Sequence, residues 1–329
     1  MVKNPSGLTT WFFDNSVYLN CMTRQQLIKI ISNLNTWKKG DQRAPHKPLL
    51  LLIALSNIQQ NKERLILFED IEKHLTELLI EFGPQRKSYH PEEPFKRLPN
   101  DEIWELKDSH NVITSTRIRN SFNKSDLKKE AIRGGFSQEI YDFIKSDLGA
   151  ISQVSSILLN THFPKTIHQD IVDAVGLDID TNHQDQFEQQ VNRKRDPAFR
   201  GKILEAYNYR CAICGFDVRI GNTPIALEAA HIKWHQAGGP DTENNGMALC
   251  SLHHKLLDRG ALGLSHDYKI IVSNKANGYG GFKEWLTDFE GREILAPRKD
   301  IYMPDIGFAK WHIREVFQGS YDQDDKLYV

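Results

Sequence analysis

Residues 211 to 258 hold most of the cysteines of this chain. The block contains three of the four cysteines and four of the thirteen histidines among 329 residues. Cys211 and Cys214 form a CxxC pair, and Cys250 with His253 forms a CxxH pair at the same spacing. Two such pairs can close a tetrahedral shell of soft or borderline ligands around Zn²⁺. The spacing therefore predicts a structural zinc site, and this site constrains how the C-terminal region can fold.

A second histidine stands beside the predicted zinc ligand. His254 follows His253 directly, so that on sequence grounds either imidazole can be the fourth ligand. Neighbouring positions on a helix point about 100° apart, which predicts that the two rings serve different sites. The CxxH spacing repeats the CxxC spacing and favours His253 for zinc. A CxxC pair alone is also typical of redox-active cysteines, but the second pair favours metal binding.

Three residues of the block have no place in this zinc shell: His231, Asn245 and His254, in the order His, Asn, His. Their order among the zinc ligands resembles that of the HNH, or ββα-metal, nucleases. The resemblance implies a β-hairpin that carries the first His, a loop that carries the Asn and a helix that carries the last His, with one divalent ion between hairpin and helix. Residues 224–233 have the pattern of a strand, and residues 247–257 have that of a helix.

The resemblance also implies how these residues would divide the work of phosphodiester hydrolysis. His231 would take a proton from the attacking water, a role that its near-neutral pKa permits. His254 would hold Mg²⁺ or Mn²⁺ against the scissile phosphate, where the ion neutralises developing charge. Asn245 would hydrogen-bond the backbone and fix the loop that orients His231. His235 is interpreted as a DNA contact or a surface residue.

The second ligand of this catalytic ion stays open. Ala230 stands where the family often has a metal-binding Asp before the first His. Glu228 is the natural substitute, because side chains alternate along a strand and positions 228 and 230 share a face opposite His231. Asp258 lies one helical turn beyond His254 and is the alternative, either as a ligand or as the group that orients the imidazole.

The region that begins at Met22 has mainly helical patterning. The apolar run LLLLIAL after Pro48 predicts a helix in the core, and three prolines between residues 91 and 99 predict a loop. The predicted helices are residues 24–34, 45–58, 67–82, 125–134 and 137–148, and the predicted strand is 103–106. The expected fold class is α+β, with a mainly helical N-terminal domain joined to a zinc-stabilised ββα-metal nuclease domain.

The helical region carries a resemblance of its own. Its segments are RAPHKPLLLL from Arg43, FGP from Phe82, PFKRL from Pro94 and WEL from Trp104. They resemble the sulfur-binding domain that recognises phosphorothioate-modified DNA in bacterial restriction enzymes, and the resemblance continues through the HNH half to WHIREVFQG from Trp311. It implies a type IV, phosphorothioate-dependent restriction endonuclease.

Sulfur recognition has a simple physical basis. A sulfur in place of a non-bridging phosphate oxygen is larger, softer and less hydrated, so a shallow apolar cavity favours it while basic side chains hold the rest of the backbone. The expected walls are Pro94 and Phe95, with the aliphatic stem of Arg97 or Arg119. Glu93 stands where relatives often carry an aromatic residue. Tyr89 and His90 are alternative walls, and the expected phosphate and base contacts are Arg43, His46 and Lys47.

The length of the chain exceeds one typical hydrophobic core and predicts two domains. The predicted units are an N-terminal extension over 1–21, a DNA-binding and phosphorothioate-binding domain over 22–148, a helical linker over 149–197 and an HNH nuclease domain over 198–329. The formal net charge is -1, yet basic residues gather within 117–133 and 193–202. Such clusters provide salt-sensitive affinity for phosphates.

The expected compartment is the cytoplasm, and no membrane partner is expected. The chain has no apolar run of about eighteen residues and no secretory signal pattern. Cys21 has no evident disulfide partner, which is typical of a reducing compartment.

Double-stranded DNA is the expected partner. One active site per chain leaves two routes to double-strand cleavage, a homodimer or sequential nicking. Two other hypotheses stay open, an HNH nuclease directed at another DNA modification or at unmodified sites, and a zinc-stabilised DNA-binding module without catalysis. An RNA nuclease is disfavoured, because the sequence lacks an aromatic platform for base stacking.

Overall fold

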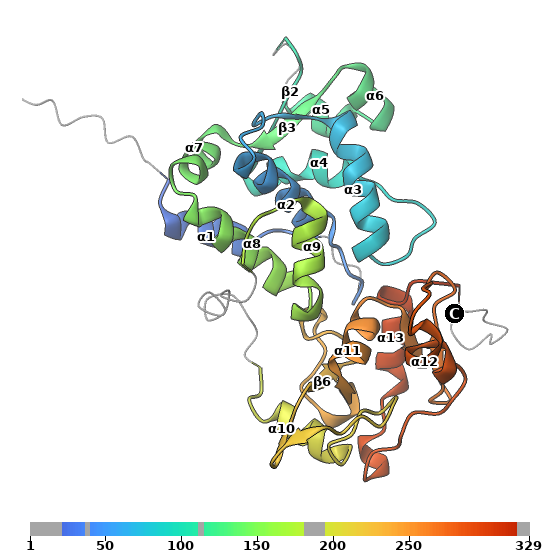
Figure 1. Ribbon diagram of the computed structural model, residues 1–329. Coiled ribbons are helices and arrows are strands. Elements are labelled where there is room, and N and C mark those ends of the chain that lie inside the picture. The colour runs from blue at the N-terminus through green and yellow to red at the C-terminus, as the bar shows by residue number, and fades with distance from the viewer. Residues whose placement is uncertain (1–21, 37–39, 111–114, 181–194, 321–329) are drawn as a thin grey trace, which may run out of the picture.

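The computed structural model describes residues 22–36, 40–110, 115–180 and 195–320. A mainly helical half at the top of Figure 1 leads into a half built on short hairpins at the bottom. Buried apolar side chains form two clusters, one starting at Leu27 and the other at Phe199. The predicted α+β class is confirmed. The expected extension with Cys21 and two basic residues of the second cluster, Arg193 and Lys194, lie outside the described residues.

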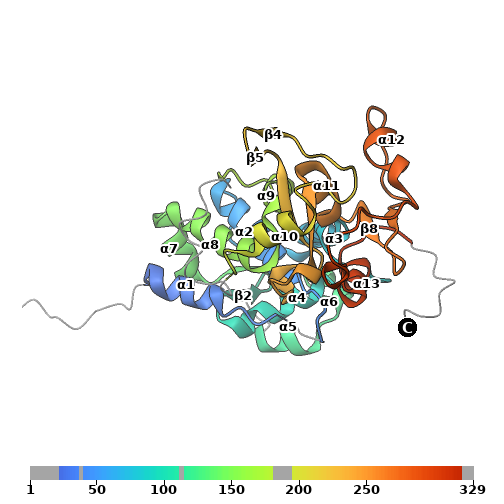
Figure 2. The ribbon, with the colours of Figure 1, turned by 90° about the horizontal axis from the view of Figure 1, so that it is seen from below.

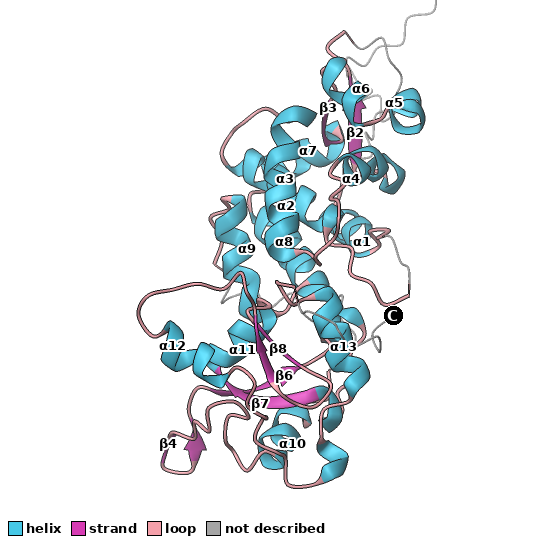
Figure 3. Ribbon diagram, turned by 90° about the vertical axis from the view of Figure 1, so that its right-hand side faces the viewer, coloured by secondary structure: helices cyan, strands magenta, loops and turns pink. Residues whose placement is uncertain are grey.

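The N-terminal half is arranged around a single buried helix. Its helices are α1 (Arg24–Ser32), α2 (His46–Gln59), α3 (Phe68–Phe82), α4 (Glu92–Arg97), α5 (Ser115–Ser121), α6 (Lys124–Lys129), α7 (Gln138–Ser146), α8 (Gly149–His162) and α9 (His168–Val175). The apolar run of α2 is buried, and its leucines, including Leu49 and Leu55, have no exposed surface. A helix that is apolar on all sides must be surrounded by other elements. The helices around α2 in Figure 3 provide that cover.

A small sheet closes the end of this helical half. Its antiparallel strands are β1 (Ile66–Leu67), β3 (Arg133–Phe136) and β2 (Trp104–Lys107), in that spatial order. Gly134 on the central strand faces aromatic rings, because a Cβ there would lie 2.6 Å from Trp104 Nε1 and 2.7 Å from the Phe95 ring. Only glycine lets these rings approach the strand so closely. The rings of Phe95 and Trp104 are 6.0 Å apart and meet edge to face.

Two local expectations for this half are wrong. The segment expected as a loop contains α4, because Pro91 lies at its N-cap and Pro94 in its first turn, where a missing N–H breaks no helical hydrogen bond. The helix expected over 125–134 ends at Lys129, and the chain then enters β3 at Arg133. Pairing with β1 and β2 overrides the local helical pattern there.

The residues expected as a linker contain two helices of the first core. Ile151 and Leu158 of α8 and Ile171 of α9 are buried in the same cluster as α2. Gly176, with φ of 71°, ends α9 in the left-handed conformation that glycine adopts without strain. The N-terminal core therefore continues to Ile179.

The C-terminal half contains the expected hairpin and helix. Its elements are α10 (Phe199–Ala206), β4 (Arg219–Ile220), β5 (Thr223–Pro224), β6 (Leu227–His231), β7 (Gly246–Cys250), α11 (Ser251–Asp258), β8 (Leu262–Leu264), β9 (Ile270–Val272), α12 (Phe282–Trp285) and α13 (Ile306–Glu315). Strands β6 and β7 pair antiparallel, with Leu227 opposite Cys250, and α11 follows β7 directly. The expected helix over 247–257 is wrong at its start, because Met247 to Cys250 form β7. Figure 2 views the molecule from this end, with α12 on its outer edge.

The two halves are joined by apolar packing and by a buried charge. Trp234 and Trp311 of the C-terminal half belong to the N-terminal core. The Arg43 guanidinium lies 3.9 Å from the centroid of the Trp234 ring and donates hydrogen bonds to the carbonyl oxygens of Phe82, at 2.8 Å, and Glu315, at 2.7 Å. Within the described residues, we find no helix with the length and apolar character needed to span a bilayer.

Candidate active site and metal centre

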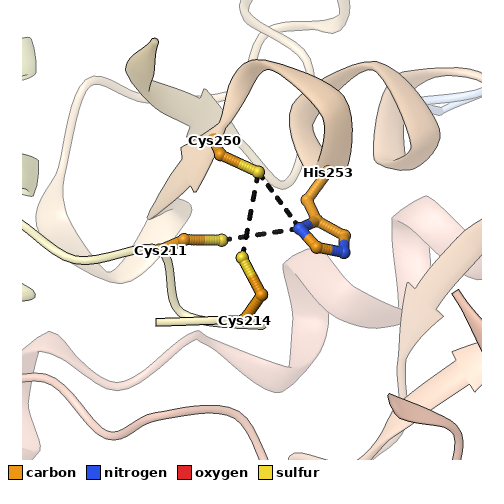
Figure 4. A group of neighbouring side chains, drawn as sticks. All are labelled: Cys211, Cys214, Cys250 and His253. Carbon is orange, nitrogen blue, oxygen red and sulfur yellow. Dashed lines mark hydrogen bonds between the residues drawn. The ribbon is translucent and has the colours of Figure 1, made fainter. Parts of the chain in front are cut away.

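Four soft or borderline ligands converge beside the β6–β7 hairpin. Cys211 and Cys214 come from the turn after α10, Cys250 ends β7, and His253 lies in the first turn of α11 (Figure 4). One ligand atom from each residue lies within 4.8 Å of all the others. The sulfur atoms of Cys214 and Cys250 are 4.0 Å apart, close to the edge of about 3.8 Å that Zn–S bonds of about 2.3 Å give in a tetrahedron. This group fits a zinc ion.

The second nitrogen of His253 supports this arrangement. Nδ1 of His253 faces the thiols, 3.1 Å from Cys250 Sγ, while Nε2 lies 3.0 Å from the carbonyl oxygen of Trp285. A carbonyl accepts only from an N–H, so Nε2 carries the proton and Nδ1 is left free to bind metal. His254 takes no part in this group, because its ring contacts carboxylates instead.

A separate cavity of about 380 Å³ brings His231 of β6 and His254 of α11 together with Glu228. Glu228 and His231 both line it, although strand alternation predicts that they point to opposite faces. Among the described strands, β6 pairs only with β7. Three cations line the same cavity: Lys165, Arg195 and Arg200.

His231 is held as a neutral imidazole. Its Nε2 lies 2.8 Å from Asp241 Oδ1, and its ring stacks on Phe199 with centroids 4.1 Å apart. Burial lowers the pKa of His231 to about 4, although the bond to Asp241 acts in the opposite direction. The Asp241 carboxylate accepts a hydrogen bond from the N–H at Nε2. Nδ1 of the neutral ring therefore keeps a lone pair that can accept a proton. Asp241 and Phe199 were not predicted, since no spacing rule connects them to His231.

Asn245 closes the loop between the two strands of the hairpin. Its side chain is buried, accepts a hydrogen bond from the Lys233 amide at 2.8 Å and donates to the carbonyl oxygens of Lys233, at 3.0 Å, and Pro240, at 2.9 Å. Gly239 packs against this clasp, because a Cβ there would lie 1.9 Å from the Lys233 carbonyl oxygen. The clasp thus fixes the backbone that follows His231 directly.

His254 lies between two carboxylates of different exposure. Its Nδ1 is 2.6 Å from Glu228 Oε2, and its Nε2 is 3.2 Å from Asp258 Oδ2. The Glu228 side chain is 40% exposed, whereas that of Asp258 is 2% exposed. Burial disfavours the charged imidazole, yet Asp258 and Glu228 outweigh burial and raise the pKa of His254 to about 10. The two carboxylates therefore create a negative environment around His254, and the ring can hold a metal ion there once one of its nitrogens is unprotonated.

A second, larger cavity of about 1210 Å³ is lined mainly by the N-terminal half, with Gln236 from the C-terminal half. Six of the nine predicted sulfur and DNA contacts line it: Arg43, His46, Lys47, His90, Pro94 and Arg97. Burial, with His90 and Arg86 nearby, lowers the pKa of His46 to about 4, so that this imidazole is neutral. Arg86 and His162 also line the cavity and were not among the predicted contacts. No spacing rule connects them to the segments that begin at Arg43 and Pro94.

Three predicted contacts do not line this cavity. Phe95 has no exposed surface and packs 5.0 Å from the Phe68 ring, so that it is a core residue and not a cavity wall. Tyr89 packs partly buried against the same core. Arg119 donates to Asn100 Oδ1 at 2.8 Å, and Asn100 is at the cavity. Arg119 therefore lies one residue away from the lining.

The three predicted cations at the cavity all have protein partners, and that of Arg97 is Glu93. Lys47 donates to the Asn35 carbonyl at 2.6 Å and pairs with Asp101. Arg43 lies at the junction between the two halves, where its guanidinium donates hydrogen bonds to two backbone carbonyl oxygens. These contacts give Arg43 a structural role at the junction, while Arg43 also lines the cavity, so that its DNA contact stays a prediction.

Comparison with known families matches each half of the chain separately. Residues 24–180 match the model of the ScoMcrA-like DNA sulfur-binding domain, and residues 211–265 match the model of the HNH endonuclease. Comparison with curated proteins gives no match. The matched ranges contain the cavity residues of the N-terminal half and the ligands of the C-terminal half, respectively.

Solved structures show a limited likeness. The sulfur-binding domain of SprMcrA in complex with phosphorothioated DNA is 18% identical, with 47% of this chain and 95% of that chain covered and a TM-score of 0.39. The sulfur-binding and SRA domains of ScoMcrA with phosphorothioated DNA are 16% identical, with 62% and 68% covered and a TM-score of 0.41. The type IV phosphorothioation-dependent restriction endonuclease ScoMcrA is 16% identical, with 45% and 32% covered and a TM-score of 0.38.

Each family match covers residues that line one of the two cavities. An HNH endonuclease domain works with a divalent metal ion, and the cysteine and histidine group beside it can bind zinc. The chain therefore carries a DNA sulfur-binding domain of the ScoMcrA-like family followed by an HNH endonuclease domain, and it is a metal-dependent DNA endonuclease.

Proposed function

We propose that this protein is a type IV restriction endonuclease that binds phosphorothioate-modified DNA and cuts it nearby. The observation that carries the proposal is the cavity beside Pro94, which lies within the matched sulfur-binding domain. The same chain holds the nuclease cavity with His231 and His254. A recognition site and a cutting site in one chain restrict cleavage to the neighbourhood of the modification.

The lining of the larger cavity suits a phosphorothioate. Pro94 and Pro84 offer apolar surface to the sulfur, and Arg86 and Arg97 offer charge to the remaining phosphate oxygens. Sulfur loses less hydration than oxygen when it enters an apolar site, so the proline surface discriminates between the two while the cations do not. We assign recognition to this surface, with His46 as a neutral hydrogen-bonding group.

We propose that the recognition unit extends from residue 22 to residue 180. The apolar faces of α8 and α9 are buried in the same core as α2, and the family match covers the same residues. A fragment that ends at residue 148 would lack α8 and α9, and it would expose to water the apolar side chains of α2 that these helices cover. The second core begins at Phe199 in α10, and we propose that the nuclease unit begins just before this helix.

For cleavage, we propose that His231 acts as the general base. Asp241 fixes the proton on Nε2, and Phe199 holds the plane of the ring, so that Nδ1 accepts a proton from the attacking water. Lys165 and Arg200 lie at the same cavity and hold phosphate oxygens of the DNA. Asn245 keeps the backbone after His231 in place.

Glu228 and His254 fit a divalent ion, for which we propose Mg²⁺ or Mn²⁺. The Glu228 carboxylate is the more exposed of the two at His254, and it faces Nδ1 of that ring. Asp258 is buried on the other side and orients the ring through Nε2. When bound, the ion supplies Lewis-acid stabilisation of the developing alkoxide. The structural site takes Zn²⁺ through its three thiols and His253.

The proposed function is tested with two duplexes of the same sequence, one of which carries a stereodefined phosphorothioate. The purified full chain is incubated with each duplex in Mg²⁺ or Mn²⁺, and binding and cleavage are measured together. Tight binding and cleavage of the modified duplex alone are expected. Equal cleavage of both duplexes would show a nuclease that does not depend on phosphorothioate. Binding of the modified duplex without any cleavage would favour a DNA-binding module.

The carboxylate of Glu93 limits DNA affinity at the recognition cavity. It lies 3.1 Å from Lys96 and 3.2 Å from Arg97, and although burial raises the pKa of Glu93, these hydrogen bonds lower it, so that the group is ionised. Replacement by glutamine removes a negative charge next to the expected phosphate and releases Arg97. We therefore expect Glu93→Gln to increase the affinity for phosphorothioate DNA several-fold.

Fluorescence anisotropy over a series of salt concentrations measures this effect. If Arg97 gains a phosphate contact, the slope of log K against log salt becomes steeper by about 0.9. Glu77→Gln, an exposed position on α3 outside the cavity lining, is the matched control. Unchanged affinity and slope in Glu93→Gln would contradict the placement of the phosphate beside Arg97.

A further inference from the structure

The segment that links α8 to α9 lies at both cavities. Thr161 and His162, at the end of α8, line the recognition cavity. Lys165 and Thr166, in the 3-10 helix η2 (Lys165–Ile167), line the nuclease cavity. One short piece of the N-terminal unit therefore connects the place where DNA is recognised with the place where it is cut.

A hydrogen bond from this segment reaches the buried carboxylate beneath the nuclease site. The Thr166 hydroxyl donates to Asp258 Oδ2, and the same oxygen lies 3.2 Å from His254 Nε2. Thr166 and Asp258 are 92 positions apart in the sequence. The chain of contacts runs from Thr166 through Asp258 to His254, and its first member belongs to the recognition unit.

The Thr166 hydrogen bond matters because the Asp258 carboxylate is almost completely buried. The Asp258 side chain is 2% exposed, so water does not take the place of a lost donor. A buried carboxylate that loses a hydrogen bond is destabilised and turns toward another donor. Any rotation of Asp258 moves the acceptor that fixes Nε2 of His254, and with it the direction of Nδ1 toward Glu228.

We propose that Thr166 is a positioning residue for the divalent ion of the nuclease site, acting through Asp258 on His254. The proposal rests on the proposed ion site at Glu228 and His254. In this arrangement the nuclease unit alone lacks one of the groups that orient its metal ligand. The recognition unit supplies that group, so the two units must be docked correctly before the ion is held in place.

Two further contacts hold η2 and α9 against α11. Lys255 lies 2.8 Å from Asp170, and Arg259 lies 3.6 Å from the same carboxylate. Both basic residues belong to the end of α11 or follow it, on the helix that carries His254. These pairs keep the donor and the acceptor of the Thr166 bond close, and the hydroxyl of Thr166 is the part that acts on the site.

The test compares Thr166→Val with Thr166→Ser in the zinc-loaded full chain. Valine keeps the shape of threonine but removes the donor, whereas serine keeps the donor. Binding of Mn²⁺ is measured without DNA by electron paramagnetic resonance, so the readout does not depend on cleavage. Thr166→Val should weaken Mn²⁺ binding about tenfold, in the range for loss of a group that orients a metal ligand. Thr166→Ser should bind as the wild type does.

Cleavage and DNA binding provide the second readout. Cleavage by Thr166→Val should approach the wild-type rate as Mn²⁺ is raised, and the affinity for phosphorothioate DNA should stay unchanged. Thr76→Val is the matched control, because Thr76 bonds the Glu72 carbonyl on α3. Zinc content and circular dichroism check that each variant is folded.

The variant His254→Ala distinguishes failure of the proposed ion site from failure of the proposed role of Thr166. If His254→Ala loses Mn²⁺ but a folded Thr166→Val binds it as the wild type does, the role of Thr166 is wrong and the ion site stands. If Thr166→Ser is as weak as Thr166→Val, the hydroxyl is not the cause and the proposal is overturned. If His254→Ala keeps wild-type Mn²⁺ affinity, the ion site fails, and the role of Thr166 fails with it.

Discussion

Replacement of His231 by alanine is expected to slow cleavage of phosphorothioate DNA by about 10²–10⁴-fold, the usual contribution of a positioned general base. The imidazole at this position is neutral, is held by Asp241 and is stacked on Phe199, so that only its Nδ1 is available to the attacking water. Alanine removes that acceptor and leaves the rest of the cavity in place. DNA affinity should not change, because the recognition cavity lies in the other half.

Single-turnover cleavage with saturating enzyme measures this loss separately from binding. His266→Ala, at an exposed position between β8 and β9, is the control for the loss of a histidine from the same unit. A wild-type cleavage rate in His231→Ala would mean that another group activates the water. Loss of DNA binding in the same variant would mean that His231 has a structural role instead.

The pH dependence follows from the same geometry. Burial lowers the pKa of His231 to about 4. The base is therefore neutral, and able to accept a proton, at any pH well above that value, and it becomes protonated only as the pH falls through it. The acid limb of the cleavage rate should lie below the ordinary imidazole pKa of about 6.5. An acid limb at the ordinary value would show that the ring is more solvated during cleavage.

Replacement of Cys211 by serine is expected to abolish cleavage by unfolding the nuclease unit. Zinc binding in small domains supplies an apparent free energy of about 10–16 kcal/mol, as large as the whole stability of a typical domain. Cys211 has no exposed surface, and with Cys250 it belongs to the second core. Loss of the ion therefore removes a cross-link between the turn after α10, β7 and α11.

Zinc content, thermal unfolding and limited proteolysis measure this effect together. We expect Cys211→Ser to lose zinc and to become sensitive to protease after residue 195, while phosphorothioate binding by the N-terminal unit persists. Cys21→Ser is the matched control, since this is the one cysteine outside the metal-binding block. A zinc-free Cys211→Ser variant with wild-type melting temperature and cleavage would overturn the structural role of the ion.

The parts of the site that depend on short spacings were predictable. Four ligands in two pairs of fixed spacing converge wherever a turn and a helix start meet, so the group from Cys211 to His253 follows from the sequence alone. The same holds for the buried helix α2, whose apolar run has one physical interpretation. The His, Asn, His order likewise predicted the elements on which these residues lie.

The parts that depend on distant contacts were not predictable. Asp241 meets His231 only because the Asn245 clasp folds the intervening loop back. Phe95 is an aromatic residue of the kind that can line a cavity. It packs instead against Phe68 and Trp104 in the core. No spacing rule connects Thr166 to its partner Asp258, because Asp258 belongs to the other unit.

The partners of Arg43 give the chain an order of assembly during synthesis. Its guanidinium stacks on Trp234 and bonds the carbonyl of Glu315, 272 positions further along. A ribosome that adds about 5–20 residues per second reaches Glu315 well after Arg43 has left it. Until then Arg43 can bond the Phe82 carbonyl of its own half, but its contacts with Trp234 and Glu315 cannot form. Docking of the two halves is thus a late event in the biogenesis of the enzyme.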